Sequence, residues 1–247
     1  MYHPHFKHNN SGMPYLKKTE ISEIAEQFIR EYSPVVLSKP QPVDVEAFLE
    51  TYLGLTLDYQ YLSNDGRFLG MTVFNDTNKV IVYIPEKNCA DYISVKHGTV
   101  IIESSLLEND NQEHRYRFTV GHECGHWIFH RKCHDYNPDQ ICLFEDGTPY
   151  IECRNVNQDY SNSNTSTWDD NRWMEWHADK FASGLLMPET AVINLLKRNN
   201  YSPLDYTGIV SSTFNVSKQA AFYRLCDLKI LKSNYDLAKE QLHQSMF

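Results

Sequence analysis

Two histidines and a glutamate lie close together in the chain, because His122, Glu123 and His126 form the pattern His-Glu-x-x-His. Residues four apart on a helix are separated by about 400° of rotation, so both imidazoles would lie on one face and could bind one divalent ion. Glu123 would lie beside that ion, within reach of a proton on a metal-bound water. The pattern therefore predicts metal-assisted chemistry with Glu123 as the general base.

A carboxylate further along the chain can complete such a site. Catalytic zinc commonly has three protein ligands and one position for water. The stretch 173–187 predicts a largely buried second helix that carries Glu175, with Asp179 one turn further on. Buried carboxylates need partners, so we expect Glu175 to be the third ligand. Metal-bound histidines usually donate their other ring N–H to a carboxylate, and Asp179 is suitably spaced to accept one.

Other metal-binding residue types follow the first motif. His130 lies one turn beyond His126 and could be a third ligand or a contact to substrate or transition state, although histidines at helix ends more often pack or satisfy carbonyls. A second metal site at Cys133, His134, Cys142 and Cys153 is conceivable. Their spacing matches no standard zinc pattern, which makes that second site the weaker interpretation.

Periodic patterns predict the elements that position these residues. Helices are predicted after Thr19, over 44–52, and over 115–129, which contains the first motif. Strands are predicted over 55–59, 67–74, 79–84 and 99–103. Hairpins that precede a metal-binding helix predict an α+β domain with a small antiparallel sheet. Residues 1–18 are expected to be a flexible N-terminal arm, and 131–171 a long insertion loop with little regular structure.

Composition limits the class of protein. Apolar residues make up 41% of the 247 residues, which is typical of a globular chain, and no apolar run is long enough to span a membrane. The net charge of −9 argues against a generally basic surface that binds nucleic acid. We find no secretory signal and no CxxC pair, so we expect a cytoplasmic protein whose cysteines remain thiols.

The last part of the chain, 191–247, is predicted to be helical. It carries seven Lys and Arg against four Asp and Glu, and it resembles a helix-turn-helix with Ser217 as an N-cap. Lys218, Gln219 and Arg224 are the candidates for DNA contact. Two alanines and an aromatic residue in the same helix favour packing instead, so direct DNA binding is not expected and a fold-completing or partner-docking bundle is preferred.

Two segments together resemble a known family. Residues 117–126 read RFTVGHECGH, and residues 175–188 read EWHADKFASGLLMP. Both are similar to the motifs of the ImmA/IrrE metallopeptidases, and the likeness extends over about 20–232. The resemblance implies a zincin-like domain over 19–190, a gluzincin-like site for one Zn²⁺ with ligands His122, His126 and Glu175, and Glu123 as base. It departs from the family at His177, where an acidic residue is common, and in the length of the segment between the motifs.

The resemblance also implies a function. Such cytoplasmic bacterial or phage-encoded hydrolases typically cleave a helix-turn-helix transcriptional repressor, and so act in transcription regulation. The alternative is a metal-stabilised binding protein that sequesters a repressor or antitoxin without cleaving it. The presence of Glu123 favours the protease, because a purely structural zinc site needs no general base.

Overall fold

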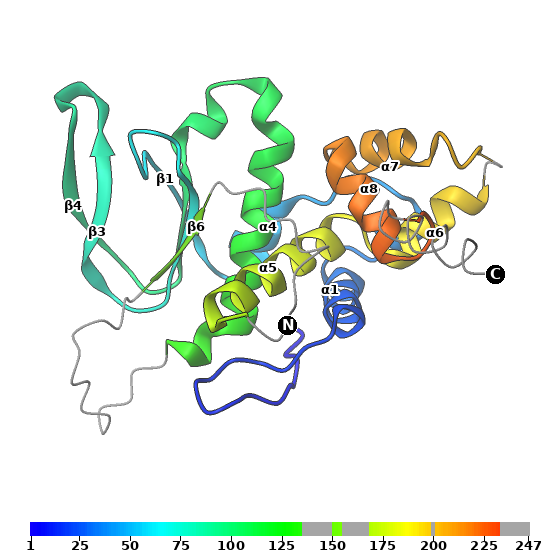
Figure 1. Cartoon of the computed structure of the whole chain (residues 1–247), viewed down its shortest axis with the longest axis horizontal. Coiled ribbons are helices and arrows are strands. Elements are labelled where there is room, and N and C mark those ends of the chain that lie inside the picture. Colours follow the sequence, from blue (N-terminus) through cyan, green and yellow to red (C-terminus); the bar gives the residue numbers. More distant parts are fainter. Residues whose placement is uncertain (135–149, 155–167, 199–200, 233–247) are drawn as a thin grey trace, which may run out of the picture.

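A small mixed sheet and two closely packed helices form the centre of the molecule. The computed structural model describes residues 1–134, 150–154, 168–198 and 201–232. Figure 1 shows the sheet on one side of helix α4, helix α5 crossing α4, and α6 to α8 at the far end. The predicted α+β class with a helical C-terminal region is confirmed. Within the described ranges, no helix combines the length and the apolar character needed to cross a membrane.

The first helices cover one side of the core. α1 (Lys18–Tyr32) buries a stripe of apolar residues at helical spacing. α2 (Val35–Ser38) and α3 (Val45–Ala47) follow, and α3 continues as a π-helical turn over Phe48–Tyr52. The side chain of Asp44 accepts a hydrogen bond from the Ala47 N–H and so begins α3. The predicted helix over 44–52 is therefore present, with its second half wound more widely.

The main sheet has four strands in the order β1-β5-β2-β6. The strands are β1 (Thr56–Gln60), β2 (Phe68–Val73), β5 (Thr99–Glu103) and β6 (Tyr150–Arg154). β2 pairs antiparallel with β5 and β6, whereas β1 pairs parallel with β5. β3 (Thr77–Ile84) and β4 (Cys89–Val95) form a separate antiparallel pair. The sequence predicted neither β4 nor β6, and β6 lies within the predicted insertion loop 131–171.

Alternating residues of the sheet face two different cores. Val100 and Ile102 of β5 pack in the large core that the helices share, whereas Ile101 packs in a smaller core with Val80 and Val82 of β3. Successive side chains on a strand point to opposite faces, so the helices cover one face and the β3–β4 pair covers the other. Figure 1 shows this arrangement, with β3 and β4 on one side of the main sheet and α4 on the other.

The central helix pair is close because small residues line the contact. α4 (Glu113–His130) packs on α5 (Asp170–Leu186), which begins at the N-cap Asp169. A Cβ added to Gly125 would lie 2.9 Å from the Cα of Ala178, which leaves no space for a side chain. Gly121, one turn earlier, faces Ala182 less tightly, because a Cβ there would lie 3.4 Å from the Ala182 Cβ. Glycine at position 125 therefore permits the close approach of the two helix backbones.

The C-terminal helices are tied to the rest of the molecule through α8. The helices are α6 (Glu189–Arg198), α7 (Tyr206–Phe214) and α8 (Lys218–Asp227). The buried guanidinium of Arg224 donates to the Met187 carbonyl and to Ser22 Oγ, at 2.9 Å each. Arg224 therefore joins α8 to α1 and to the end of α5, and it is not available at the surface for DNA contact. The predicted N-cap Ser217 accepts from the Ala220 N–H and is confirmed.

The N-terminal segment lies against the ends of α4 and α5. The Phe6 ring contacts the Phe129 ring, with centroids 5.6 Å apart, and Ser11 Oγ donates to Asp170 Oδ2 at 2.7 Å. Met13 is buried. These contacts give the segment a defined position beside the two central helices, while the flexibility expected of residues 1–18 stays a prediction.

Candidate metal centre

Three predicted ligands converge between α4 and α5. His122 Nε2 and His126 Nε2 lie 2.9 Å apart on one face of α4. Glu175 of α5 faces both rings, with its two oxygens 3.5 Å from His122 Nε2 and 3.4 Å from His126 Nε2. One donor atom from each of the three side chains lies within 4.8 Å of the others. The close helix contact at Gly125 and Ala178 lies next to these residues and brings the carboxylate to the histidines.

Asp179 lies behind His122, as its spacing predicted. Its Oδ1 is 2.8 Å from His122 Nδ1, so the Nδ1–H of a neutral His122 donates to this carboxylate. The Nε2 atom of that ring then carries a lone pair directed toward His126 and Glu175. This is the pairing by which proteins orient a metal-bound imidazole and increase its donor strength.

The arrangement of donors fits a divalent cation. Two ring nitrogens 2.9 Å apart and a carboxylate are electron-rich groups, and they need a proton or a cation between them. Burial opposes ionisation of Glu175, but its interactions with His122 and His126 outweigh burial and hold the pKa of that carboxyl well below its usual range. A permanently charged carboxylate beside two imidazoles is a donor set that suits Zn²⁺.

Glu123 is completely buried on the side of α4 that faces β2. Thr72 Oγ1 donates to Glu123 Oε2 at 2.6 Å. Glu123 Oε1 has no hydrogen-bond partner among the described residues, and a Cβ on Gly70 would overlap this oxygen. Burial raises the pKa of Glu123, although both histidines and Thr72 oppose that rise. One oxygen of the carboxylate is thus held while the other is left to accept a proton.

Gly70 and Thr72 are contributors that sequence reasoning missed. The strand over 67–74 was predicted, and alternation along it places Gly70 and Thr72 on the face opposite Met71 and Val73. This alternation was the available signal. The alternation alone could not predict the contact with Glu123, because nothing in the strand sequence shows which of its two faces meets α4.

His130 lies behind His126 and outside the group of three ligands. Its Nδ1 is 2.9 Å from His126 Nδ1, and its Nε2 is 3.4 Å from His177 Nδ1. Burial is the main reason that the pKa of His130 lies well below its ordinary value, and burial likewise lowers the pKa of His177 to about 4. The position of His130 favours support of His126 over the substrate contact considered from the sequence.

The possible second metal site is not assembled among the described residues. The ring of His134 stacks on Phe74, with centroids 4.5 Å apart. Cys133 follows α4 in a short 3-10 turn. Cys142 lies outside the described residues, and so does the side chain of Cys153.

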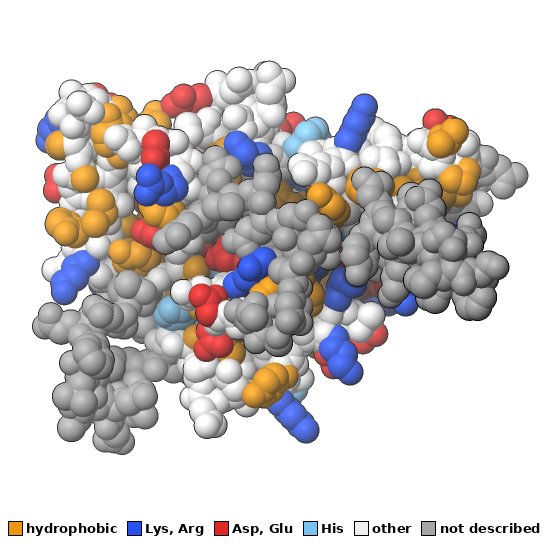
Figure 2. Space-filling view, in the orientation of Figure 1, with side chains coloured by type: hydrophobic (Ala, Val, Ile, Leu, Met, Phe, Trp, Pro, Cys, Tyr) orange, Lys and Arg blue, Asp and Glu red, His pale blue; other side chains and the backbone are white. Residues whose placement is uncertain are grey.

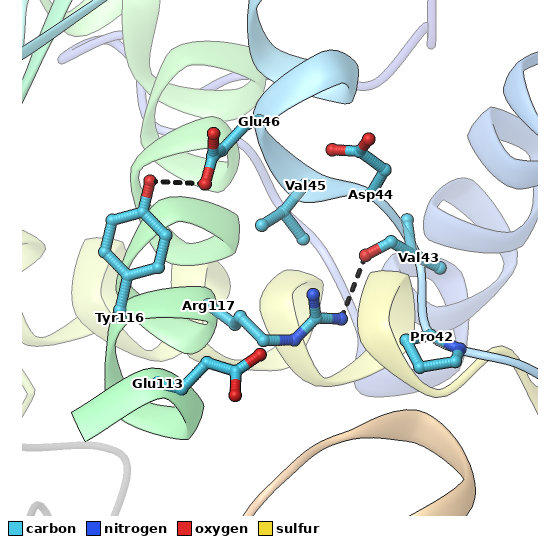
Figure 3. A pocket seen from close by; sticks show the side chains of 8 residues that line it. All are labelled: Pro42, Val43, Asp44, Val45, Glu46, Glu113, Tyr116 and Arg117. Atoms are coloured by element: carbon cyan, nitrogen blue, oxygen red, sulfur yellow. Dashed lines mark hydrogen bonds between the residues drawn. The ribbon is translucent and has the colours of Figure 1, made fainter. Parts of the chain in front are cut away.

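A cavity near the start of α4 is separate from this centre. It has a volume of about 320 Å³ and lies between the segment 42–46 and the first turn of α4. Figure 3 shows the Arg117 guanidinium donating to the Val43 carbonyl, and Tyr116 donating to Glu46. Arg117 also donates to the Asn215 carbonyl at 3.2 Å. This arginine of the RFT segment therefore anchors α4 to the N-terminal and C-terminal helices.

Fold and site define an α+β protein with an HExxH helix and a glutamate that faces the two histidines from a second helix. The sequence model of the Peptidase_M78 family, described as the IrrE N-terminal-like domain, matches residues 151–226. This match confirms the predicted resemblance to the ImmA/IrrE family and supports a metallopeptidase-type function. It includes Glu175 and Asp179 and ends in α8, whereas the HExxH helix lies before it. No curated protein matches the chain.

Proposed function

We propose that this protein is a zinc-dependent endopeptidase that cleaves a helix-turn-helix transcriptional repressor and thereby relieves repression. The observation that carries the proposal is the buried Glu123 carboxylate, which has one oxygen held by Thr72 and the other without a partner among the described residues, beside the three candidate ligands. A structural zinc site has no need for such a group.

The residues divide the work of hydrolysis between them. His122, His126 and Glu175 would hold one Zn²⁺, which when bound polarises the scissile carbonyl and lowers the pKa of its water. Glu123 Oε1 accepts the proton of the attacking water and later delivers it to the nitrogen of the leaving amine.

The substrate class follows from the family and not from the geometry. The family match supports a protein substrate, and the helix-turn-helix repressor is what the ImmA/IrrE resemblance implies. The acidic chain and the buried Arg224 support recognition of a protein over direct reading of DNA.

Glu123→Gln tests the proposal because it keeps the shape of the side chain and removes its basicity. Cells would be made to produce the wild type or the variant, and new protein N-termini would be enriched and identified by mass spectrometry. We expect one defined new N-terminus, within a helix-turn-helix repressor, only with the wild type. The same cut with Glu123→Gln would overturn the proposed base. An intact repressor that copurifies equally with both proteins would establish sequestration instead.

A further inference from the structure

Three imidazoles form a continuous line behind the candidate metal centre. The line runs from His126 through His130 on α4 to His177 on α5, with nitrogen–nitrogen distances of 2.9 Å and 3.4 Å. All three side chains are buried, with exposed fractions of 0%, 0% and 2%. The planes of the His130 and His177 rings are nearly parallel, at 23° to each other, with centroids 5.6 Å apart.

The donors and acceptors of the three neutral rings fix the direction of the hydrogen bonds along this line. His126 Nε2 faces Glu175 and His122, so a neutral His126 that offers its lone pair there carries its hydrogen on Nδ1. That Nδ1–H donates to His130 Nδ1. His130 then carries its hydrogen on Nε2 and donates it to His177 Nδ1. Each neutral ring has one donor and one acceptor, and each contact uses one of each.

Aromatic neighbours hold the last ring of the line in place. His177 lies against Trp176, Trp173 and Phe129, with ring centroids 5.6 Å, 6.0 Å and 6.2 Å away. Phe129 also borders His130, at 6.2 Å. Rings packed on several sides cannot turn without displacing their neighbours. His177 is therefore a rigid acceptor at the end of the line.

We propose that His130 and His177 are positioning residues that hold His126 as the Nδ1–H tautomer, with Nε2 directed toward Glu175. The proposal rests on the metal site of the proposed function. His122 has a carboxylate, Asp179, as its acceptor, whereas His126 has an imidazole that is in turn oriented by a second imidazole. The two histidine ligands are thus supported by different chemistry, and His126 depends on a residue of the other helix.

The first measurement is made on metal-free protein. Long-range ¹⁵N–¹H correlation spectra report whether His126 Nδ1 carries a hydrogen, whichever ring holds a proton between the Nε2 atoms of His122 and His126 when no metal is bound. We expect a hydrogen on Nδ1 in the wild type and its partial loss from Nδ1 in His177→Phe, which keeps the ring volume and removes the acceptor. His177→Gln offers a side-chain oxygen as acceptor and should restore the Nδ1–H form.

The second measurement is Zn²⁺ affinity by competition with a chromophoric chelator. Loss of a supporting hydrogen bond typically weakens metal binding about 10- to 100-fold, and we expect His130→Phe within this range and His177→Phe near its lower limit. His177→Gln should recover most of the loss. The matched control is His97→Phe, because His97 is exposed and contacts Trp127 of α4 without joining the line. If His130→Phe does not fold, the two His177 variants decide the matter.

The outcomes separate this inference from the proposed function. If the wild type binds Zn²⁺ but the His130 and His177 variants bind it equally well and keep the same His126 tautomer, the positioning role is wrong and the metal site stands. If the wild type binds no Zn²⁺, the proposed function fails, and the tautomer of metal-free His126 still tests the line. A His126 whose Nδ1 carries no hydrogen in the wild type would overturn the inference directly.

Discussion

At the scale of single residues, Glu175 decides whether the two histidines form a metal site. Its carboxylate faces both Nε2 atoms and comes from a different helix. We expect purified wild type to contain about one zinc per chain and Glu175→Ala to lose most of it, because two histidines without a third ligand bind zinc weakly. Elemental analysis of both proteins measures this. Glu23→Ala, at an exposed position of α1, is the control and should keep its zinc. Equal metal in Glu175→Ala would remove Glu175 as a ligand.

Thr72 acts on the proposed base through one hydrogen bond. Thr72→Val keeps the shape of the side chain and removes the hydroxyl that donates to Glu123 Oε2. We expect kcat for cleavage to fall about 10- to 100-fold, less than the roughly 10²- to 10⁴-fold of a complete general acid–base contribution, because Glu123 stays in place but loses the contact that orients it. Zinc content should not change, because Thr72 is not among the ligands. Thr72→Ser, which retains the hydroxyl, should recover most of kcat. A Thr72→Val enzyme as fast as the wild type would show that the bond has no catalytic role.

At the scale of elements, the α4–α5 contact has no room for an added methyl group at Gly125. A Cβ there would lie 2.9 Å from Ala178 Cα, so Gly125→Ala must separate the helices. Overpacking typically costs about 1–3 kcal/mol, and we expect a loss of unfolding free energy in this range in urea titrations. Zn²⁺ affinity should fall as well, because Glu175 and the histidines lie on opposite sides of this contact.

Gly208 provides the matched control for that prediction. It lies in α7, and a Cβ there would meet nothing within 4 Å. Gly208→Ala should stabilise the protein by about 0.4–1 kcal/mol, because alanine reduces the entropy of the unfolded chain. If the two variants change stability by the same amount in the same direction, tight packing at Gly125 is not what holds the helices together.

The sequence predicted the elements with strong hydrophobic periodicity, but it did not predict which strands pair with each other. The helix that carries His122 extends over Glu113–His130 where 115–129 was predicted, and the ligands on it followed from spacing alone. β6 is an edge strand of five residues, and its pairing with β2 depends on a distant part of the chain. The parallel pairing of β1 with β5 is likewise a tertiary property. For the same reason the contact of His177 with His130 could not be foreseen, since it requires the relative rotation of two helices.

At the scale of the whole molecule, an acidic residue of α8 joins three helices. Asp227 accepts hydrogen bonds from Lys180 of α5 at 2.6 Å and from Lys18 of α1 at 2.9 Å. Burial opposes ionisation of Asp227, but the two lysines outweigh burial and lower its pKa. Because the pKa is lower in the folded state, this stabilisation is complete above the unfolded value, about 3.9, and is lost as pH falls through the folded value.

Asp227→Asn tests this junction. In metal-free protein at neutral pH, we expect the free energy of unfolding of the Asp227→Asn variant to be about 2 kcal/mol below that of the wild type. This loss is typical for hydrogen bonds to charged groups. The difference should shrink as pH falls below about 4, because the unfolded chain then binds a proton on Asp227 that the folded protein does not yet bind. Asp205→Asn changes an exposed position and should stay within about 0.5 kcal/mol of the wild type. A difference that does not depend on pH would contradict the role of the charge.

Among the described residues, the face that Figure 2 shows gives little sign of a site for DNA. On the face that Figure 2 shows, Lys and Arg side chains are dispersed among Asp and Glu, and apolar side chains gather over the β3–β4 pair. Ile81 and Tyr92, which are register partners in that pair, are 45% and 64% exposed. This face therefore resembles the surface of a protein that meets other proteins more than one that binds a polyanion.

The position of Glu175 on α5 also has a consequence for synthesis. A chain emerges from the ribosome starting at its N-terminus, so β2 and α4 appear well before α5. Glu123 can meet Thr72 while translation is still under way, but the two histidines lack their carboxylate until α5 has emerged and packed on α4. The order of translation thus delays assembly of the three candidate ligands. A nascent chain, or one terminated before α5, carries an incomplete set of candidate ligands, and the hydrolytic activity that we propose can begin only after α5 has been made.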